Sequence, residues 1–284
     1  MDLRDISLSD REFLRIKRRV HDIAGISLSS AKATLVVSRL SRHLRRLGLS
    51  SFDAYVNYLE GEAGAAEQEA FVNSLTTNLT RFWREEHHFI HLAAQLPQLL
   101  TRRRQASAGR RPRLRIWSAG CSTGQEAYSI ALSALAACPE LASWDFRILA
   151  TDIDTSVLAR ARTGVFAATE LTGLSPARAG LFERLDGGLV QVPARARRLV
   201  TFKPLNLIGP WPMRGPFDAI FCRNVAIYFD RATQAELFAR LGAILADDGF
   251  LYIGHSESIS DPDTLRLVGK TVYQRAAVGR KSAA

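Results

Sequence analysis

Apolar residues recur every three or four positions along the first quarter of the chain. Phe13, Ile16, Val20 and Ile23 form one such set, and this spacing is typical of helices that bury one face against a core. The pattern predicts four amphipathic helices, over residues 9–24, 28–47, 51–60 and 65–76. We therefore expect residues 1–75 to form a small all-α domain.

From Arg113 onward, short apolar runs alternate with helical spacing. Such alternation favours a mostly parallel sheet with helices on both faces, the doubly wound, Rossmann-like α/β fold. The runs predict strands at 114–119, 146–151, 199–203, 217–222 and 249–254. The helical spacing predicts helices at 124–137, 155–162 and 231–245. Residues 114–275 are expected to form this second domain.

Three stretches depart from these two patterns. Residues 164–198 break the strand–helix alternation and contain a Gly187-Gly188 turn between short apolar pieces, which predicts an inserted helix and a small antiparallel β-hairpin. Residues 76–113 are expected to be a connector helix and linker, with 102–112, rich in Arg, Ser, Ala and Gly, as loop. The tail, 276–284, is expected to be disordered.

The composition suits a globular protein of a reducing compartment. Of the 284 residues, 47% are apolar, enough for a well-packed core. No apolar run approaches the roughly 20 residues that span a bilayer, and the N-terminus lacks the basic-then-apolar layout of a signal peptide. The three cysteines are widely spaced and odd in number, which argues against a disulfide framework. We expect a cytoplasmic protein without membrane insertion.

The net charge of +10 is unevenly spread. The stretch from Arg11 to Arg46 holds ten Lys or Arg and two acidic residues, a local excess of eight positive charges. A second cluster precedes the first predicted strand and consists of Arg102, Arg103, Arg104, Arg110, Arg111 and Arg113. Such asymmetry indicates an acidic partner, whether nucleic acid, an anionic membrane or an acidic protein, unless both clusters are solvated surfaces.

Residues 114–130 read as a buried strand, a glycine-bounded turn from Gly120 to Gly124, and the first turns of a helix. Such a turn lets a ligand approach bare backbone, and the helix start offers unpaired N–H groups. The next predicted strand ends at Asp152, where a carboxylate usually accepts hydrogen bonds from ribose hydroxyls. Asp154 is better placed to cap the following helix. The combination indicates a nucleoside-containing cofactor.

Six segments with distinctive motifs follow one another in a fixed order. They are TNLTRFWR at 77–84, SAGCSTGQEAYS at 118–129, ATDIDTSVL at 150–158, LNL at 205–207, FDAIFCRNVAIYFD at 217–230 and GHSES at 254–258. Together they resemble the CheR-type chemotaxis receptor methyltransferases, and the similarity extends from about residue 9 to 275. The resemblance implies an S-adenosylmethionine-dependent methyltransferase domain with a small antiparallel β insertion, preceded by an all-α domain.

The resemblance also implies an activity and a cofactor site. The activity is methylation of glutamate side chains on the cytoplasmic helices of chemotaxis receptors, which yields glutamyl methyl esters and S-adenosylhomocysteine. Arg84 matches the residue expected to bind the methionine carboxylate, Glu126 the acid that faces the amino group, and Asp152 the ribose acid. The complete set of matched cofactor residues is Asn78, Thr80, Arg84, Glu126, Asp152, Asn206, Leu207, Arg223 and Asn224.

Methyl transfer to an ionised carboxylate requires no nucleophile and no strong base from the enzyme. For that reason, His255 and Ser256 are expected to shape a loop rather than to form a catalytic triad with Glu257. We expect an apolar pocket in which Arg223, Tyr228 or Arg102 (or another arginine of 102–104) orients the substrate. The basic helix at 28–47 offers Arg39, Arg42, Arg45 and Arg46 to the acidic receptor helices.

His87, His88 and His91 have helical spacing, but no carboxylate or cysteine motif completes a metal site, so no metal is expected. Two other functions stay open at this stage. One is a non-catalytic module that senses the cofactor, and the other is a nucleic-acid methyltransferase. Base-modifying enzymes often carry an Asn/Asp-Pro-Pro-aromatic motif where this chain has RNVAIY at 223–228, and we therefore expect no nucleic-acid partner.

Overall fold

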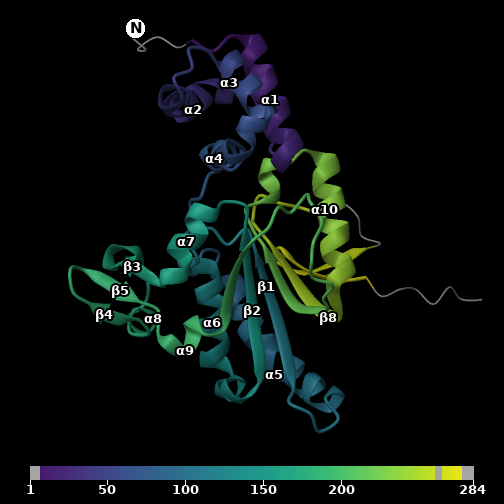
Figure 1. The fold of residues 1–284 in the computed structure, drawn as a ribbon. Coiled ribbons are helices and arrows are strands. Elements are labelled where there is room, and N and C mark those ends of the chain that lie inside the picture. The colour runs from purple at the N-terminus through teal and green to yellow at the C-terminus, as the bar shows by residue number, and fades with distance from the viewer. Residues whose placement is uncertain (1–6, 260–263, 277–284) are drawn as a thin grey trace, which may run out of the picture.

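The computed structural model describes residues 7–259 and 264–276. Four helices form the N-terminal part, α1 (Asp10–Ala24), α2 (Ala33–Leu47), α3 (Phe52–Glu60) and α4 (Ala65–Leu75). Figure 1 shows them grouped at one end of the molecule, in purple and blue. The four predicted helices are confirmed, although α2 begins five residues later than expected, after a short 3₁₀ turn.

Local signals explain where α1 begins and ends. The Ser9 hydroxyl accepts from the Glu12 N–H at 3.3 Å, and the Glu12 carboxylate accepts from the Ser9 N–H at 2.9 Å, a capping box. Gly25 adopts a left-handed φ of 70° and ends the helix. Between these ends, Ile16 and Val20 are fully buried in a core that the four helices share.

The second part contains a seven-stranded sheet in the order β6-β2-β1-β7-β8-β10-β9. Neighbouring strands are parallel except for β10, which is antiparallel to both β8 and β9. The strands are β1 (Arg113–Ala119), β2 (Asp145–Asp152), β6 (Val200–Pro204), β7 (Phe217–Cys222), β8 (Leu245–Ile253), β9 (Leu265–Gly269) and β10 (Val272–Arg275). The five predicted strands are confirmed, whereas β9 and β10 were not predicted because their apolar runs are short.

Helices cover both faces of this sheet. They are α5 (His87–Ala106), α6 (Gln125–Ala137), α7 (Thr155–Thr163) and α10 (Arg231–Ile244). Side chains of β1 alternate between the faces: Leu114 and Ile116 join the core with α5 and α6, while Trp117 and Ala119 join the core with α10. The doubly wound α/β expectation is confirmed. Short 3₁₀ turns occur at η2 (Ser30–Lys32), η3 (Glu62–Gly64), η4 (Pro139–Ser143), η5 (Ala168–Leu171) and η6 (Ala226–Tyr228).

Two predictions need correction. The expected loop at 102–112 is wrong in its first half, because α5 continues to Ala106 and Arg103 anchors its last turn to Asp218 and Asp248. The insertion holds more than a hairpin: β3 (Val165–Ala167), β5 (Leu189–Gln191) and β4 (Glu183–Leu185) form a separate three-stranded antiparallel sheet. Two one-turn helices accompany it, α8 (Pro176–Ala179) and α9 (Ala194–Arg197).

The three cysteines, Cys121, Cys138 and Cys222, are buried as free thiols. Burial raises the pKa of each thiol above its ordinary value. Among the described residues, no helix is both long and apolar enough to cross a membrane. The tail expected to be disordered lies outside the described residues, apart from Ala276.

Candidate functional site

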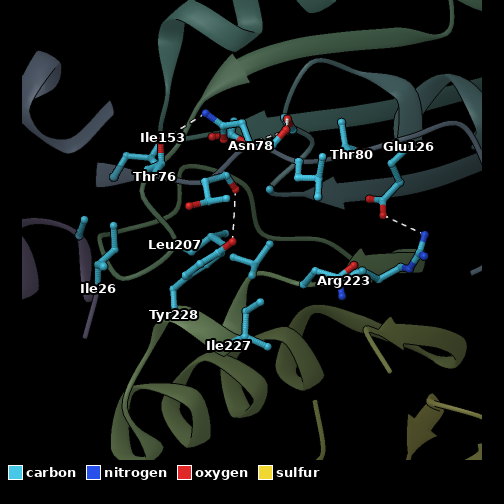
Figure 2. Close-up of a pocket in the computed structure, with 18 of the residues that line it drawn as sticks. Ile26, Thr76, Asn78, Thr80, Glu126, Ile153, Leu207, Arg223, Ile227 and Tyr228 are labelled. Carbon is cyan, nitrogen blue, oxygen red and sulfur yellow. Dashed lines mark hydrogen bonds and ion pairs between the residues drawn. The ribbon is translucent and has the colours of Figure 1, made fainter. Parts of the chain in front are cut away.

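A pocket opens where the parallel strands end, between the sheet and the segment that joins α4 to α5 (Figure 2). All nine cofactor residues suggested by the resemblance line this one pocket, although they come from five separate segments of the chain. Tyr228 lines it as well. Ala24, the last residue of α1, and Ile26, two residues beyond it, complete the wall, so the helical part contributes directly to the site.

The turn after β1 brings backbone close to the pocket. Gly120 has a φ of 80°, and a Cβ added there would lie 2.3 Å from a methyl carbon of Val225, so only glycine fits. Ser122, with a φ of 50°, donates its N–H to Asp152 Oδ2 at 2.8 Å. The other carboxylate oxygen of Asp152 accepts from the Asp154 N–H at 3.0 Å. Asp152 therefore holds the glycine turn against the end of β2.

Asp152 keeps capacity for a ligand after these two bonds. Each carboxylate oxygen can accept about two hydrogen bonds, so lone pairs remain for ribose hydroxyls. Burial raises the pKa of Asp152, while the N–H donors act in the opposite direction. Asp154 caps α7 as expected, since its Oδ1 accepts from the Ser156 N–H at 2.9 Å.

The joining segment is fixed to the turn by Asn78. Its side-chain amide donates to Asp154 Oδ2 at 2.8 Å, and its carbonyl accepts from the Ser122 hydroxyl at 2.9 Å. Close by, Arg84 donates from Nη1 to the Leu79 carbonyl at 3.0 Å. Arg84 is half-buried and has further N–H groups for a carboxylate. Asn78 thus positions the segment that carries Arg84.

The buried guanidinium of Arg223 lies between two carboxylates, those of Glu126 and Glu85. Arg223 Nη1 contacts Glu126 Oε2 at 3.1 Å (Figure 2), and Arg223 Nη2 lies 3.5 Å from Glu85 Oε2. The Arg223 side chain is 2% exposed. Burial raises the pKa of Glu126, although the charge of Arg223 opposes this shift. For Glu85, burial acts in the same upward direction, but the hydrogen bond from His255 and the charge of Arg223 outweigh it and lower its pKa to about 2.

The helical part meets the sheet beside the same pocket. Asn206 donates from its side chain to the Ile23 carbonyl at 2.6 Å. His21 Nε2 lies 2.7 Å from Asp230 Oδ2, and Ile26 forms an isolated antiparallel bridge with Phe229. Figure 1 shows the corresponding approach of α1 to α10. Because of these contacts, a shift of the helical part would change the pocket wall.

The loop after β7 is held by the carboxylate of Glu257, the neighbour of the two residues, His255 and Ser256, that were expected to shape a loop. Glu257 accepts from the backbone N–H groups of Gly254, Asn224, Val225 and Ile227, the last three at 2.9, 3.0 and 3.3 Å. Glu257 is 8% exposed. Three of its four partners line the pocket or flank it directly. The GHSES motif was the only sequence signal for this role, and it does not reveal which groups the glutamate binds.

The expectation that Arg102 orients the substrate is wrong. Arg102 lies in the last turns of α5, where its Nη1 contacts Asp248 Oδ2 at 3.1 Å near the beginning of β8. Its neighbour Arg103 pairs with Asp218 at the beginning of β7. The pocket lies at the opposite, carboxyl ends of these parallel strands, and none of the arginines at 102–104 lines it.

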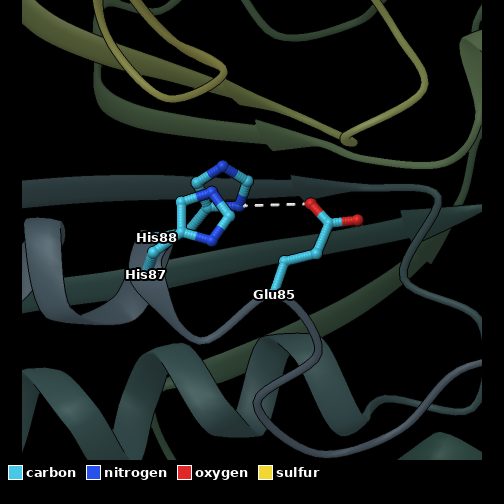
Figure 3. Close-up of side chains that lie close together, drawn as sticks. All are labelled: Glu85, His87 and His88. Atoms are coloured by element: carbon cyan, nitrogen blue, oxygen red, sulfur yellow. Dashed lines mark ion pairs between the residues drawn. The ribbon is translucent and has the colours of Figure 1, made fainter.

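Two of the three histidines, His87 and His88, lie beside Glu85, a carboxylate that the sequence did not link to them (Figure 3), whereas His91 Nδ1 lies 3.0 Å from the Tyr252 hydroxyl. His88 Nδ1 is 3.7 Å from Glu85 Oε2, and the candidate ligand atoms of Glu85, His87 and His88 lie within 4.8 Å of one another. Burial, and then the charge of Arg223, lowers the pKa of His88 to about 3. That positive charge would also repel a divalent cation, so we do not assign a metal to this cluster.

The four arginines expected to face a partner divide into two kinds. Arg39 donates to the Thr76 carbonyl at 2.5 Å, and Arg46 pairs with the buried carboxylate of Glu67. Arg42 and Arg45 are exposed, and Arg42 makes only longer contacts, at 3.4 Å. The Arg46 side chain is 57% exposed but is held by Glu67. Arg42 and Arg45 are therefore the two that a partner could bind with the least loss of internal contacts.

Comparison with known proteins covers nearly the whole chain. The model of the CheR methyltransferase all-alpha domain matches residues 11–76, and that of the CheR methyltransferase SAM-binding domain matches residues 78–274. A probable chemotaxis protein methyltransferase from Rhizobium etli is 46% identical over 93% of this chain and 100% of its own length.

Two further relatives share the same name. A chemotaxis protein methyltransferase from Escherichia coli K12 is 45% identical over 94% of this chain and 92% of its own. Chemotaxis protein methyltransferase 2 from Pseudomonas aeruginosa is 45% identical over 93% of each chain. This chain belongs to the CheR methyltransferase family and is an S-adenosylmethionine-dependent methyltransferase.

Proposed function

We propose that the protein methylates glutamate side-chain carboxylates on the cytoplasmic helices of chemotaxis receptors, with glutamyl methyl esters and S-adenosylhomocysteine as products. The observation that carries this proposal is the nearly end-to-end similarity to proteins named chemotaxis protein methyltransferases. The pocket supports this proposal because its lining combines polar groups suited to the cofactor with an apolar wall. The methyl transfer itself requires no nucleophile from the enzyme.

The polar groups of the pocket suit the parts of the cofactor. Asp152 has acceptor capacity left for two hydroxyls, and Glu126 is a buried acceptor for an ammonium group. Arg84 uses one N–H donor on the Leu79 carbonyl and can offer others to a carboxylate, for which its planar fork is well shaped. When bound, S-adenosylmethionine supplies an electrophilic methyl group on a sulfonium.

On the acceptor side, the protein has to align the glutamate oxygen and exclude water. A glutamate carboxylate is already ionised at neutral pH, so no proton has to be removed. Tyr228 is the better candidate for orienting it, since its hydroxyl lies at the pocket wall, 3.3 Å from the Thr77 carbonyl. Arg223 is less suited to that role because two glutamates already surround its guanidinium; we assign it to positioning Glu126.

Transfer of a labelled methyl group tests the proposal directly. Purified receptor cytoplasmic domains would be incubated with the enzyme and methyl-labelled S-adenosylmethionine, then treated with mild base. Release of labelled methanol is expected, because a carboxyl ester is base-labile and an N-methyl product is not. Base-stable label would contradict the proposal, and so would cofactor binding without transfer to any receptor. Stronger methylation of RNA than of receptor would favour the nucleic-acid alternative.

The exposed arginines of α2 are proposed to guide the acidic receptor. The double change Arg42→Glu and Arg45→Glu should raise the receptor KM and flatten its salt dependence, while cofactor affinity stays unchanged, because exposed charges act mainly on encounter. The matched control, Arg195→Glu with Arg266→Glu, makes the same charge change on exposed residues of the second part. Equal KM values for both double variants would exclude α2 as the docking face.

A further inference from the structure

Two exposed apolar side chains border the methyl-transfer pocket. Leu79 is 81% exposed, the highest value for a large apolar side chain among the described residues, and Ile227 is 44% exposed. Both line the pocket, and Ile227 is labelled at its edge in Figure 2. Isolated exposed apolar residues are common on protein surfaces, but a pair at the entrance of a reactive pocket is a candidate contact for the second substrate.

The backbone at these positions is well fixed, so the exposure of the side chains is not that of a loose loop. The Leu79 carbonyl accepts from Arg84, and the preceding carbonyl, of Asn78, accepts from the Ser122 hydroxyl. On the other side, the Ile227 N–H donates to Glu257 at 3.3 Å. The two segments are joined across the entrance by the hydrogen bond from the Tyr228 hydroxyl to the Thr77 carbonyl.

We propose that Leu79 and Ile227 form an apolar lip that receives the acceptor helix around its reactive glutamate. This inference rests on the proposed function, which brings such a helix to this entrance. The lip is continuous with the pocket, because both side chains line it and are exposed, so a helix that brings its carboxylate to the pocket would contact them. Residues three or four positions from the glutamate lie on the same helix face and would contact the lip. The acceptor should therefore have small or apolar residues there, with acidic residues excluded.

The lip has a chemical role as well as a recognition role. The carboxylate and the sulfonium neutralise each other in the transition state, so water at the entrance favours the separated charges of the ground state. Apolar contact around the glutamate removes that water as the acceptor docks. Loss of the lip should therefore impair reaction with the acceptor without changing how tightly the cofactor binds.

The test uses the full-length enzyme with Leu79→Ser, with Ile227→Ser, and with Leu267→Ser as matched control, an exposed leucine on β9 outside the pocket. Each lip variant should lower kcat/KM for the receptor domain about tenfold, as expected for lost burial of one large apolar side chain. Affinity for S-adenosylhomocysteine, measured by calorimetry, should stay within about twofold, and the Leu267→Ser variant should match the wild type in both assays.

A second arm changes the acceptor. Replacing a small residue four positions from the methylated glutamate with Asp should slow the wild-type enzyme about tenfold and the Leu79→Ser enzyme much less, since the two changes affect one contact. Equal slowing of both enzymes would overturn the proposed contact between the lip and the acceptor. A Leu79→Ser variant that changes cofactor affinity but not kcat/KM for the receptor would overturn it as well. If the wild type forms a base-labile ester while the lip variants react normally, only the lip fails. If the wild type forms no such ester, both proposals fail.

Discussion

Replacing Glu257 by Gln tests how the pocket loop is held. The two carboxylate oxygens share four backbone N–H donors, with Gly254 and Asn224 on Oε2 and Val225 and Ile227 on Oε1. A glutamine keeps one acceptor oxygen and turns an NH₂ group toward the other two donors. Two buried N–H groups then lack a partner, at roughly 1–3 kcal/mol each. With partial relaxation of the loop, we expect a loss of about 3 kcal/mol in the free energy of unfolding.

Chemical denaturation of the cofactor-free protein measures this loss, and calorimetry with S-adenosylhomocysteine measures its effect on the pocket. The affinity should fall as well, because Asn224 and Val225 line the pocket. Glu86→Gln is the matched control: Glu86 is 54% exposed and pairs with Arg178 at 2.7 Å, a surface contact worth about 0–1 kcal/mol. Equal unfolding midpoints for the two variants would refute the assignment of Glu257 as the residue that holds this loop.

Three other predictions concern separate parts of the molecule. Asp152→Ala should weaken S-adenosylhomocysteine binding, measured by calorimetry, roughly ten- to hundredfold. It should also lower the melting temperature of the cofactor-free protein, because two N–H groups lose their acceptor. An unchanged melting temperature would contradict this structural role of Asp152. The pKa of His88 is lowered to about 3 in the folded protein, so unfolding takes up a proton below pH 6.5. The free energy of unfolding should therefore decrease as the pH is lowered from 6.5, by up to about 1.4 kcal/mol per pH unit. Between pH 6.5 and 4, the free energy of unfolding measured by chemical denaturation should depend less steeply on pH in the His88→Gln variant than in the wild type. Equal slopes for the two proteins would contradict this prediction. Arg46→Glu should lower the melting temperature by several degrees because it places a second carboxylate beside Glu67, whereas the exposed Arg45→Glu should not.

The position of the pocket was predictable from the chain because it depends on local signals. A glycine turn after one strand and an acid after the next lie at the same edge of a parallel sheet, whichever residues fill the core. The nine residues carried over from the family resemblance therefore meet in one pocket. The prediction that Asp154 caps the following helix was confirmed for the same local reason, because the N–H group that it binds belongs to Ser156, only two residues later.

Residues whose roles depend on distant partners were not predictable in this way. Arg102 belongs to a basic cluster that looks available to a ligand, but its partner, Asp248, is 146 positions away in the chain. Arg46 likewise looked like surface charge until α4 brought Glu67 beside it. Glu257 collects backbone donors from two loops, and a pattern of side chains says nothing about where N–H groups point.

The burial of all three cysteines has a practical consequence for experiments on this protein. Thiol reagents attack the thiolate, and raised pKa values together with burial leave little of it accessible at neutral pH. A cysteine introduced at an exposed position such as Leu267 would therefore be the preferred site of labelling in an otherwise native chain. Pairs of such cysteines, one on α2 and one on β9, would carry fluorophores or spin labels that report whether the helical part moves when cofactor or receptor binds.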